Sequence, residues 1–119
     1  MIEFTKLEKA VLQDLCLQLP TERAILTAQV AAAKVRSREN TGVGFYTSFA
    51  VERSNLPPLA GERMRVGGWA RVNGLENPMG FILWLKDGYV DCLEGFATAD
   101  STVSMDLAAL IFEMGPLSK

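Results

Sequence analysis

The 119-residue chain contains no histidine. This absence excludes Ser-His and Cys-His nucleophile pairs, histidine-bearing zinc sites and the usual pH switch near neutrality. Cysteine is also scarce, since only Cys16 and Cys92 are present and they have neither Cys-x-x-Cys spacing nor neighbouring ligand residues. We expect both to be small buried apolar residues, and we expect no metal and no cofactor.

Long apolar runs and a strong excess of one charge are missing as well. No run approaches the roughly 20 residues that a membrane span requires, and the N-terminus lacks the order of a signal peptide. The formal net charge of −2 argues against general attraction to nucleic acid or to anionic membranes. With 49% hydrophobic and 22% charged residues, the composition predicts a single cytoplasmic domain over residues 1–119.

Two helices are predicted at the N-terminal end. Thr5-Lys6-Leu7-Glu8 has the form of a capping box, and apolar residues then recur at spacings of three and four. We therefore expect a helix over about residues 5–18. Pro20 ends this helix and can open a second one over about residues 21–33, which is rich in alanine.

Strand patterns follow the helices. A short strand is expected over about residues 35–39, alternating strands over about 45–52 and 63–73, and a hairpin over 79–98. Gly67-Gly68 predicts either a bulge or the close approach of another backbone. For the last segment a helix capped by Ser104 and stopped at Gly115-Pro116 is favoured, and the alternative is one helical turn followed by an edge strand. The order predicts an α+β fold, with two N-terminal helices on one face of a four- or five-stranded antiparallel sheet.

The hairpin turn at Asp87-Gly88 fixes a register, because a type I′ turn opposes Lys86 to Tyr89. Counting outward opposes Phe81 to Glu94 and places that carboxylate on the apolar core face. The second face of the sheet is unusually apolar for a side left to water, so the C-terminal segment or another subunit is expected to cover it. Its apolar residues are Ile82, Trp84, Leu93 and Trp69.

Glu94 is the sharpest candidate for chemistry. Burial among apolar residues would suit it to general acid or base catalysis. The alternative, which we favour, is structural: Glu94 pairs with an arginine, caps a backbone group near the end of the sheet, or is turned outward by a bulge at Gly95.

Two further motifs give weaker signals. Arginine side chains around an indole can stack on a base or bind an anion, but a solvated strand face with acidic partners is the simpler interpretation. The residues concerned are Arg63, Arg65, Trp69 and Arg71. Gly42-x-Gly44 lacks the third glycine of a dinucleotide fingerprint and precedes a strand, so we interpret it as a turn.

The hairpin pattern also carries a resemblance. Gly80-Phe81, Asp87-Gly88 and Leu93-Glu94-Gly95-Phe96, with Arg38-Glu39-Asn40-Thr41-Gly42 and Gly44-Phe45 upstream, resemble small bacterial proteins of unassigned function that share a G-F-x5-D-G-x4-L-E-G-[FY] hairpin. The resemblance covers roughly the C-terminal two-thirds of the chain, rests mostly on turn glycines and core positions, and implies no catalytic residue.

The sequence thus predicts a small binding or protein–protein interaction module rather than an enzyme. We expect it to form a homodimer through the sheet face of Ile82, Trp84, Leu93 and Trp69. The alternative is a small-molecule site between helices and sheet, in which Glu94 and either Arg36 or Arg38 fix a polar ligand. A third hypothesis is a histidine-free enzyme that uses Glu94 as its acid or base.

Overall fold

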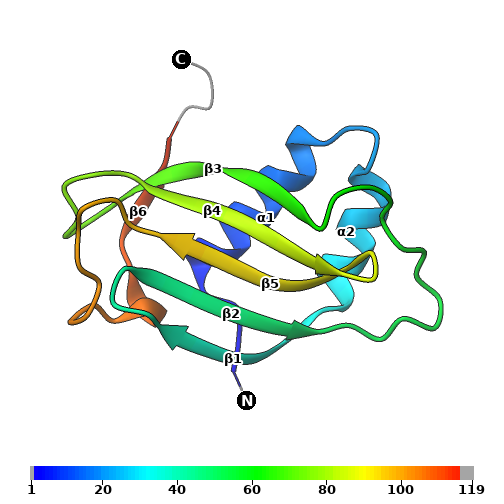
Figure 1. Ribbon diagram of the computed structural model, residues 1–119, viewed down its shortest axis with the longest axis horizontal. Coiled ribbons are helices and arrows are strands. Elements are labelled where there is room, and N and C mark those ends of the chain that lie inside the picture. The colour runs from blue at the N-terminus through cyan, green and yellow to red at the C-terminus, as the bar shows by residue number, and fades with distance from the viewer. Residues whose placement is uncertain (1, 116–119) are drawn as a thin grey trace.

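The computed structural model describes residues 2–115 and has two layers, a pair of helices and a sheet (Figure 1). Helices α1 (Lys6–Gln18) and α2 (Arg23–Ala32) lie against one face of a six-stranded antiparallel sheet. The predicted α+β class is confirmed, with six strands instead of four or five. Neither helix in this part of the chain is long and apolar enough to cross a membrane.

The sheet has the strand order β1-β2-β5-β4-β3-β6. Its strands are β1 (Lys34–Asn40), β2 (Gly44–Ala50), β3 (Met64–Val72), β4 (Met79–Lys86), β5 (Tyr89–Phe96) and β6 (Phe112–Met114). All pairings are antiparallel, and β1 and β6 form the two edges. The core lies between the helices and the sheet face that they cover, and its most deeply buried side chains are Leu7, Val11, Leu15, Leu26, Met79, Phe81, Leu83 and Leu93.

The predicted capping box starts α1. The Thr5 hydroxyl oxygen accepts a hydrogen bond from the Glu8 backbone N–H at 3.0 Å, and the Glu8 carboxylate accepts one from the Thr5 N–H at 2.9 Å. Two backbone donors that a helix start leaves unpaired are therefore satisfied by side chains. The cap also brings Glu8 to the core side of the sheet, where it is 1% exposed.

The hairpin turn is confirmed, but the predicted register beyond it is wrong. Asp87 and Gly88 both have positive φ, at 55° and 87°, as a type I′ turn requires. Leu85 pairs with Val90 as expected, whereas the next pair is Trp84 with Cys92, so one extra residue of β5 forms a bulge.

The bulged residue is Asp91. Because of this extra residue, every later side chain of β5 points to the opposite face from the one that the predicted register gives it. Leu93 points into the core, where it is fully buried, and Glu94 turns to the opposite face. The physical reason is burial: the shifted register buries a leucine in place of a cysteine and leaves a carboxylate outside the apolar core.

The bulge predicted at Gly67-Gly68 is confirmed, since the register of β3 shifts between Val66 and Trp69. A Cβ atom on Gly67 would lie 3.4 Å from Phe81 Cβ and 3.6 Å from Leu15 Cγ, so α1 packs closely there. The shift places Met64 and Val66 on the uncovered face and Ala70 on the core face.

The prediction of a C-terminal helix is wrong, and the alternative of one helical turn followed by an edge strand is confirmed. Asp106 caps a single 3-10 turn, η1 (Leu107–Ala109), by accepting a hydrogen bond from Ala108 N–H at 3.1 Å. The residues after it alternate with period two and pair with β3, which favours a strand. Pro116 lies outside the described residues. The apolar side chains of this segment pack against the core: Met105, Leu107, Leu110, Phe112 and Met114.

Candidate functional site

The sheet face turned away from the helices, which we call the outer face, is the candidate site. Figure 1 looks onto this face, with both helices behind the strands. The C-terminal segment packs on the core side, so no helix or strand among residues 2–115 covers the outer face. The pairing of strands places on it Tyr46, Met64, Val66, Trp69, Ile82, Trp84, Cys92, Glu94 and Phe96.

These side chains form three rows that cross β2, β5, β4 and β3. The central row is Tyr46, Glu94, Ile82 and Val66. The row nearer the hairpin turn is Ser48, Cys92, Trp84 and Met64, and the third is Gly44, Phe96, Gly80 and Trp69. Cross-strand neighbours stand about 5 Å apart, so each row is a continuous contact surface.

Much of this apolar surface is open. Val66 is 66% exposed, and Tyr46, Met64 and Phe96 are between 37% and 39% exposed. Trp69, Ile82 and Trp84 are half-buried by their neighbours. Contiguous apolar and aromatic surface of this kind is typical of a binding face.

Glu94 stands in the middle of the outer face. Its Oε1 atom accepts a hydrogen bond from Trp84 Nε1 at 3.0 Å. The negative charge of Glu94 is the main cause that raises the pKa of Tyr46, so this phenol stays protonated and can donate a hydrogen bond. Glu94 therefore organises two amphipathic aromatic side chains.

The other reactive group of the outer face is held inert. Burial, followed by the charge of Asp91, raises the pKa of the Cys92 thiol to about 11. A thiol with so high a pKa is a poor nucleophile at neutral pH, because the thiolate is the reactive form. At the far end of the face, the Arg71 guanidinium lies 5.9 Å from the Trp69 ring centroid.

The structure separates the predicted ligand-binding residues. Glu94 was expected on the core face beside an arginine, but it lies on the outer face, whereas Arg38 points to the helix side. Arg36 is exposed and forms a bulge on the edge strand β1. Glu94, Arg36 and Arg38 thus do not converge on one site.

Of the four residues predicted for the interface, three lie together. Ile82, Trp84 and Trp69 are on the outer face. The prediction for Leu93 is wrong, because the bulge at Asp91 places this side chain in the core.

Sequence reasoning missed several residues of the outer face. Simple alternation carried through the bulge at Gly67-Gly68 puts Met64 and Val66 on the same face as Ala70, whereas the register shift places them on the outer face. The unbulged register of β5 likewise puts Phe96 in the core. The signal that could have found Phe96 was the burial of Glu94 in the unbulged register, an unfavourable arrangement that a one-residue shift removes. For Met64 and Val66 the signal was the Gly67-Gly68 bulge itself.

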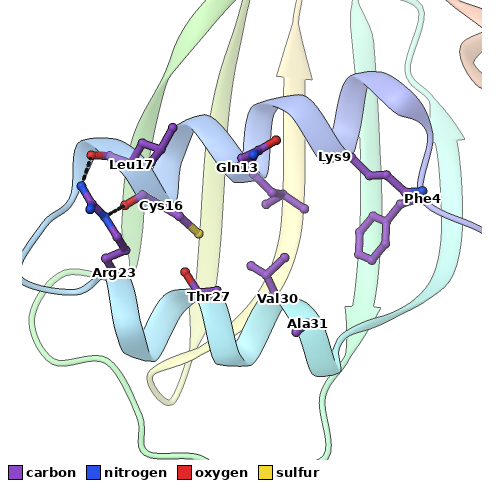
Figure 2. Close-up of a pocket in the computed structure, with 10 residues that line it drawn as sticks. Phe4, Lys9, Gln13, Cys16, Leu17, Arg23, Thr27, Val30 and Ala31 are labelled. Atoms are coloured by element: carbon purple, nitrogen blue, oxygen red, sulfur yellow. Dashed lines mark hydrogen bonds between the residues drawn. The ribbon is translucent and has the colours of Figure 1, made fainter.

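A cavity of about 490 Å³ lies in the other layer, between α1 and α2 (Figure 2). It is lined by Phe4, Lys9, Leu12, Gln13, Cys16, Leu17, Arg23, Thr27, Val30 and Ala31. Every one of these belongs to the helices or to the residues that flank α1 and α2, so the cavity does not include Glu94.

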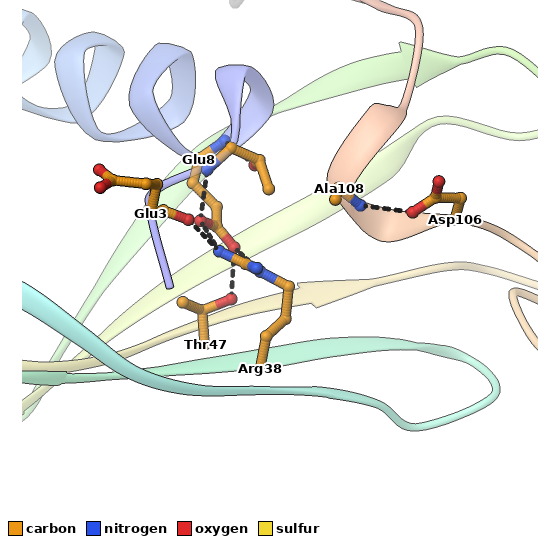
Figure 3. A network of polar contacts seen from close by, with 7 residues as sticks. Glu3, Glu8, Arg38, Thr47, Asp106 and Ala108 are labelled. Atoms are coloured by element: carbon orange, nitrogen blue, oxygen red, sulfur yellow. Dashed lines mark hydrogen bonds and ion pairs between the residues drawn. The ribbon is translucent and has the colours of Figure 1, made fainter. Parts of the chain in front are cut away.

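Arg38 instead takes part in a buried network around Glu8 (Figure 3). Arg38 Nε and one terminal nitrogen each donate to a different carboxylate oxygen at 2.7 Å. Thr47 Oγ1 donates to Glu8 at 2.5 Å, and the Arg38 guanidinium also donates to the Glu3 carbonyl oxygen at 2.8 Å. Every oxygen of this carboxylate is therefore occupied by protein donors, which indicates a structural role.

Among residues 2–115, no three cysteine, aspartate or glutamate side chains converge in a way that could hold a metal ion. Comparison with protein-family models, with curated proteins and with solved structures finds no match to this chain.

Proposed function

We propose that this protein is an interaction module that self-associates by packing its outer face against the outer face of a second copy. The observation that carries the proposal is the open aromatic and aliphatic surface of the three rows, with Val66 66% exposed near its edge. Tryptophan and tyrosine are enriched where proteins bind one another, because they combine a large apolar area with one polar group.

The size of the outer face supports a dimer. Six strands of about seven residues give a flat area on the order of 550 Å², from spacings of about 4.8 Å between strands and about 3.3 Å along them. Side-chain relief enlarges this area toward the roughly 800 Å² per partner of a standard interface. A two-fold axis that lies in the plane of the interface and runs perpendicular to the rows would let each row contact its counterpart. Two-fold symmetry is the commonest symmetry of homo-oligomers.

The edges of the sheet favour association through the face. Edge β1 carries charged side chains and is interrupted by the bulge at Arg36, two features that discourage strand-to-strand pairing. Edge β6 has only three residues, Phe112–Met114. Neither edge offers a long, flat row of backbone donors and acceptors.

The charged groups of the outer face have partners within the face. Glu94 accepts a hydrogen bond from Trp84, and the Arg71 guanidinium lies 5.9 Å from the Trp69 ring centroid. A second copy that covers Glu94 must supply further hydrogen-bond donors to its carboxylate, because one neutral donor leaves the buried charge uncompensated.

Tryptophan fluorescence tests the proposal directly, because both tryptophans of the chain, Trp69 and Trp84, lie on the outer face. We expect dilution to shift the emission maximum to longer wavelength as the dimer dissociates and the indoles meet water. Molar mass measured by light scattering over the same concentrations should fall in parallel. A constant monomer mass at high micromolar concentration would contradict self-association.

A matched pair of variants places the contact. Val66→Lys puts a charge on the outer face and should raise the dimer dissociation constant by at least about tenfold. Val103→Lys changes a residue that is 74% exposed on a loop outside the face and should leave that constant unchanged. Equal effects of the two variants would remove the outer face from the dimer contact.

A further inference from the structure

The cavity between α1 and α2 forms a groove on the side of the molecule opposite to the outer face. Its floor is apolar: Leu12 lines it, Cys16 and Val30 are turned inward, and Phe4 stands at one end (Figure 2 shows the last three). The Phe4 ring is itself held against Phe49 of the sheet, with 5.3 Å between centroids. The groove is thus a formed feature of the packed helices.

A cationic side chain lies at each end of the groove, and the two differ in whether they have a partner. At one end Arg23 donates to the carbonyl oxygens of Cys16 and Leu17, at 3.2 and 2.9 Å, and so neutralises the C-terminal end of α1 (Figure 2). At the other end Lys9 is exposed and makes no ion pair with any residue from 2 to 115. None of the residues from 2 to 115 that line the groove is an aspartate or a glutamate.

We propose that this groove binds a small amphipathic molecule, with an aliphatic chain along the floor and a carboxylate at Lys9. The apolar lining selects the chain, and the single unpaired cation selects a negative end group. A volume of about 490 Å³ corresponds to roughly 16 water-sized groups of about 30 Å³ each, enough for a carboxylate with about ten carbons.

This site is independent of self-association. The groove opens on the helix layer, whereas the proposed dimer contact lies on the outer face of the sheet (Figure 1). Failure of either proposal therefore leaves the other standing, and a dimer would carry two accessible grooves.

Decanoate is the probe, used below its micelle concentration in calorimetric titrations of the full chain, with decanol as the uncharged comparison. We expect saturable binding of both, with decanoate the tighter. Lys9→Glu should weaken decanoate by about tenfold and change decanol by less than about twofold. Lys6→Glu, an equal charge change at an exposed lysine of the same helix outside the groove, is the control.

A filled groove locates the site. Ala31→Trp places a large side chain at the exposed rim of the groove and should abolish binding of both probes, whereas Ala24→Trp, exposed on the same helix but outside the lining, should not. Helical circular dichroism checks that both variants are folded. Decanoate should also slow labelling of Cys16 by a thiol reagent and leave the labelling of Cys92 unchanged.

Three results would overturn the proposal. The first is absence of saturable decanoate binding to the wild-type chain. The second is binding that survives Ala31→Trp, which would locate the ligand elsewhere. The third is an equal loss of decanoate and decanol in Lys9→Glu, because it would show that Lys9 does not recognise the carboxylate.

Discussion

Each oxygen of the buried Glu8 carboxylate accepts two hydrogen bonds. One oxygen takes the Thr5 N–H and an Arg38 nitrogen, and the other takes Arg38 Nε and the Thr47 hydroxyl. A buried ion pair is a weak source of net stability, but removal of one partner leaves an uncompensated charge. The arginine is therefore needed mainly because the carboxylate is there.

Arg38→Met should lower the free energy of unfolding by about 3 kcal/mol, because it strands the Glu8 carboxylate, which is 1% exposed. Arg36→Met, two positions earlier in the same strand but exposed, should change it by less than about 0.5 kcal/mol. Urea unfolding followed by fluorescence measures both. A loss in Arg38→Met no greater than in Arg36→Met would refute the buried pair.

The capping box made Glu8 visible in the sequence, whereas its partners were not. Thr5 and Glu8 are three residues apart, so local geometry alone brings them together. Arg38 and Thr47 reach the same carboxylate from β1 and β2, and they lie 30 and 39 residues after Glu8 in the chain. Such pairing depends on the register of the sheet, which spacing within one segment does not contain.

Gln29 joins a helix to the tip of the hairpin. Its side chain is fully buried, and its amide nitrogen donates to the carbonyl oxygens of Pro57 and Gly88, both at 3.0 Å. Its amide oxygen accepts from the Val90 N–H at 2.9 Å. One side chain thus pairs three backbone groups in the proline-rich loop, the turn and β5.

Gln29→Leu keeps the side-chain volume but removes the side-chain partner of the Val90 N–H and of the Pro57 carbonyl oxygen, whereas the Gly88 carbonyl oxygen keeps the hydrogen bond from Leu59 N–H at 2.8 Å. The substitution should lower the free energy of unfolding by about 2 kcal/mol. Amide hydrogen exchange at Val90 should accelerate more than at amides in the middle of β4. Gln13→Leu, an exposed glutamine of α1, is the control and should have little effect on either measurement. Unchanged exchange at Val90 would argue against this connection.

Helices and strands could be located from the sequence because their periodicity is local, and the described elements begin and end within a few residues of the prediction. The C-terminal segment was harder to assign, because the spacing of its apolar residues between Leu107 and Met114 fits a helix and also fits one helical turn followed by a strand. Pairing with β3 decides that case, and it is a tertiary effect. The pairing of β2 with β5 likewise joins segments far apart in the chain.

Acid stability is a property of the whole molecule to which one surface pair contributes with a known sign. The hydrogen bond from Arg65 is the main cause that lowers the pKa of Glu22. Both nitrogen–oxygen distances of this pair are 2.8 Å. A carboxyl group whose folded pKa is depressed stabilises the fold above its unfolded pKa, and this contribution is lost as the pH falls through the folded value.

We therefore expect the wild-type free energy of unfolding to decline between about pH 5 and about pH 3, and Glu22→Gln to decline less over the same range. At neutral pH the variant should be the less stable of the two. Glu3→Gln, at an exposed carboxylate, should keep the wild-type slope. Chemical unfolding at several pH values measures the slopes, and parallel curves for wild type and Glu22→Gln would contradict the role of this pair.

The molecule as a whole has one side that the sequence could anticipate and one that it could not. An apolar second sheet face follows from Ile82, Trp84 and Trp69 alone, so the candidate surface was predictable. The helix groove was not, because it arises from how α1 and α2 pack rather than from any motif. Its lining residues are spread over both helices and the residue Phe4 before them.

The bulge at Asp91 has a consequence for insertions and deletions. Side chains along β5 alternate between the two faces of the sheet, counted from the turn. One extra residue that bulges out of the ladder therefore decides which of the later residues face the core. Deletion of Asp91, a single partly exposed residue, would leave Val90, Cys92 and Leu93 opposite Leu85, Trp84 and Leu83 in a regular ladder, so Leu93 would stay in the core. A ladder that kept Asp91 but lost the bulge would instead turn Leu93 out of the core and Glu94 into it. The strand should therefore tolerate loss of this residue better than loss of the bulge that accommodates it.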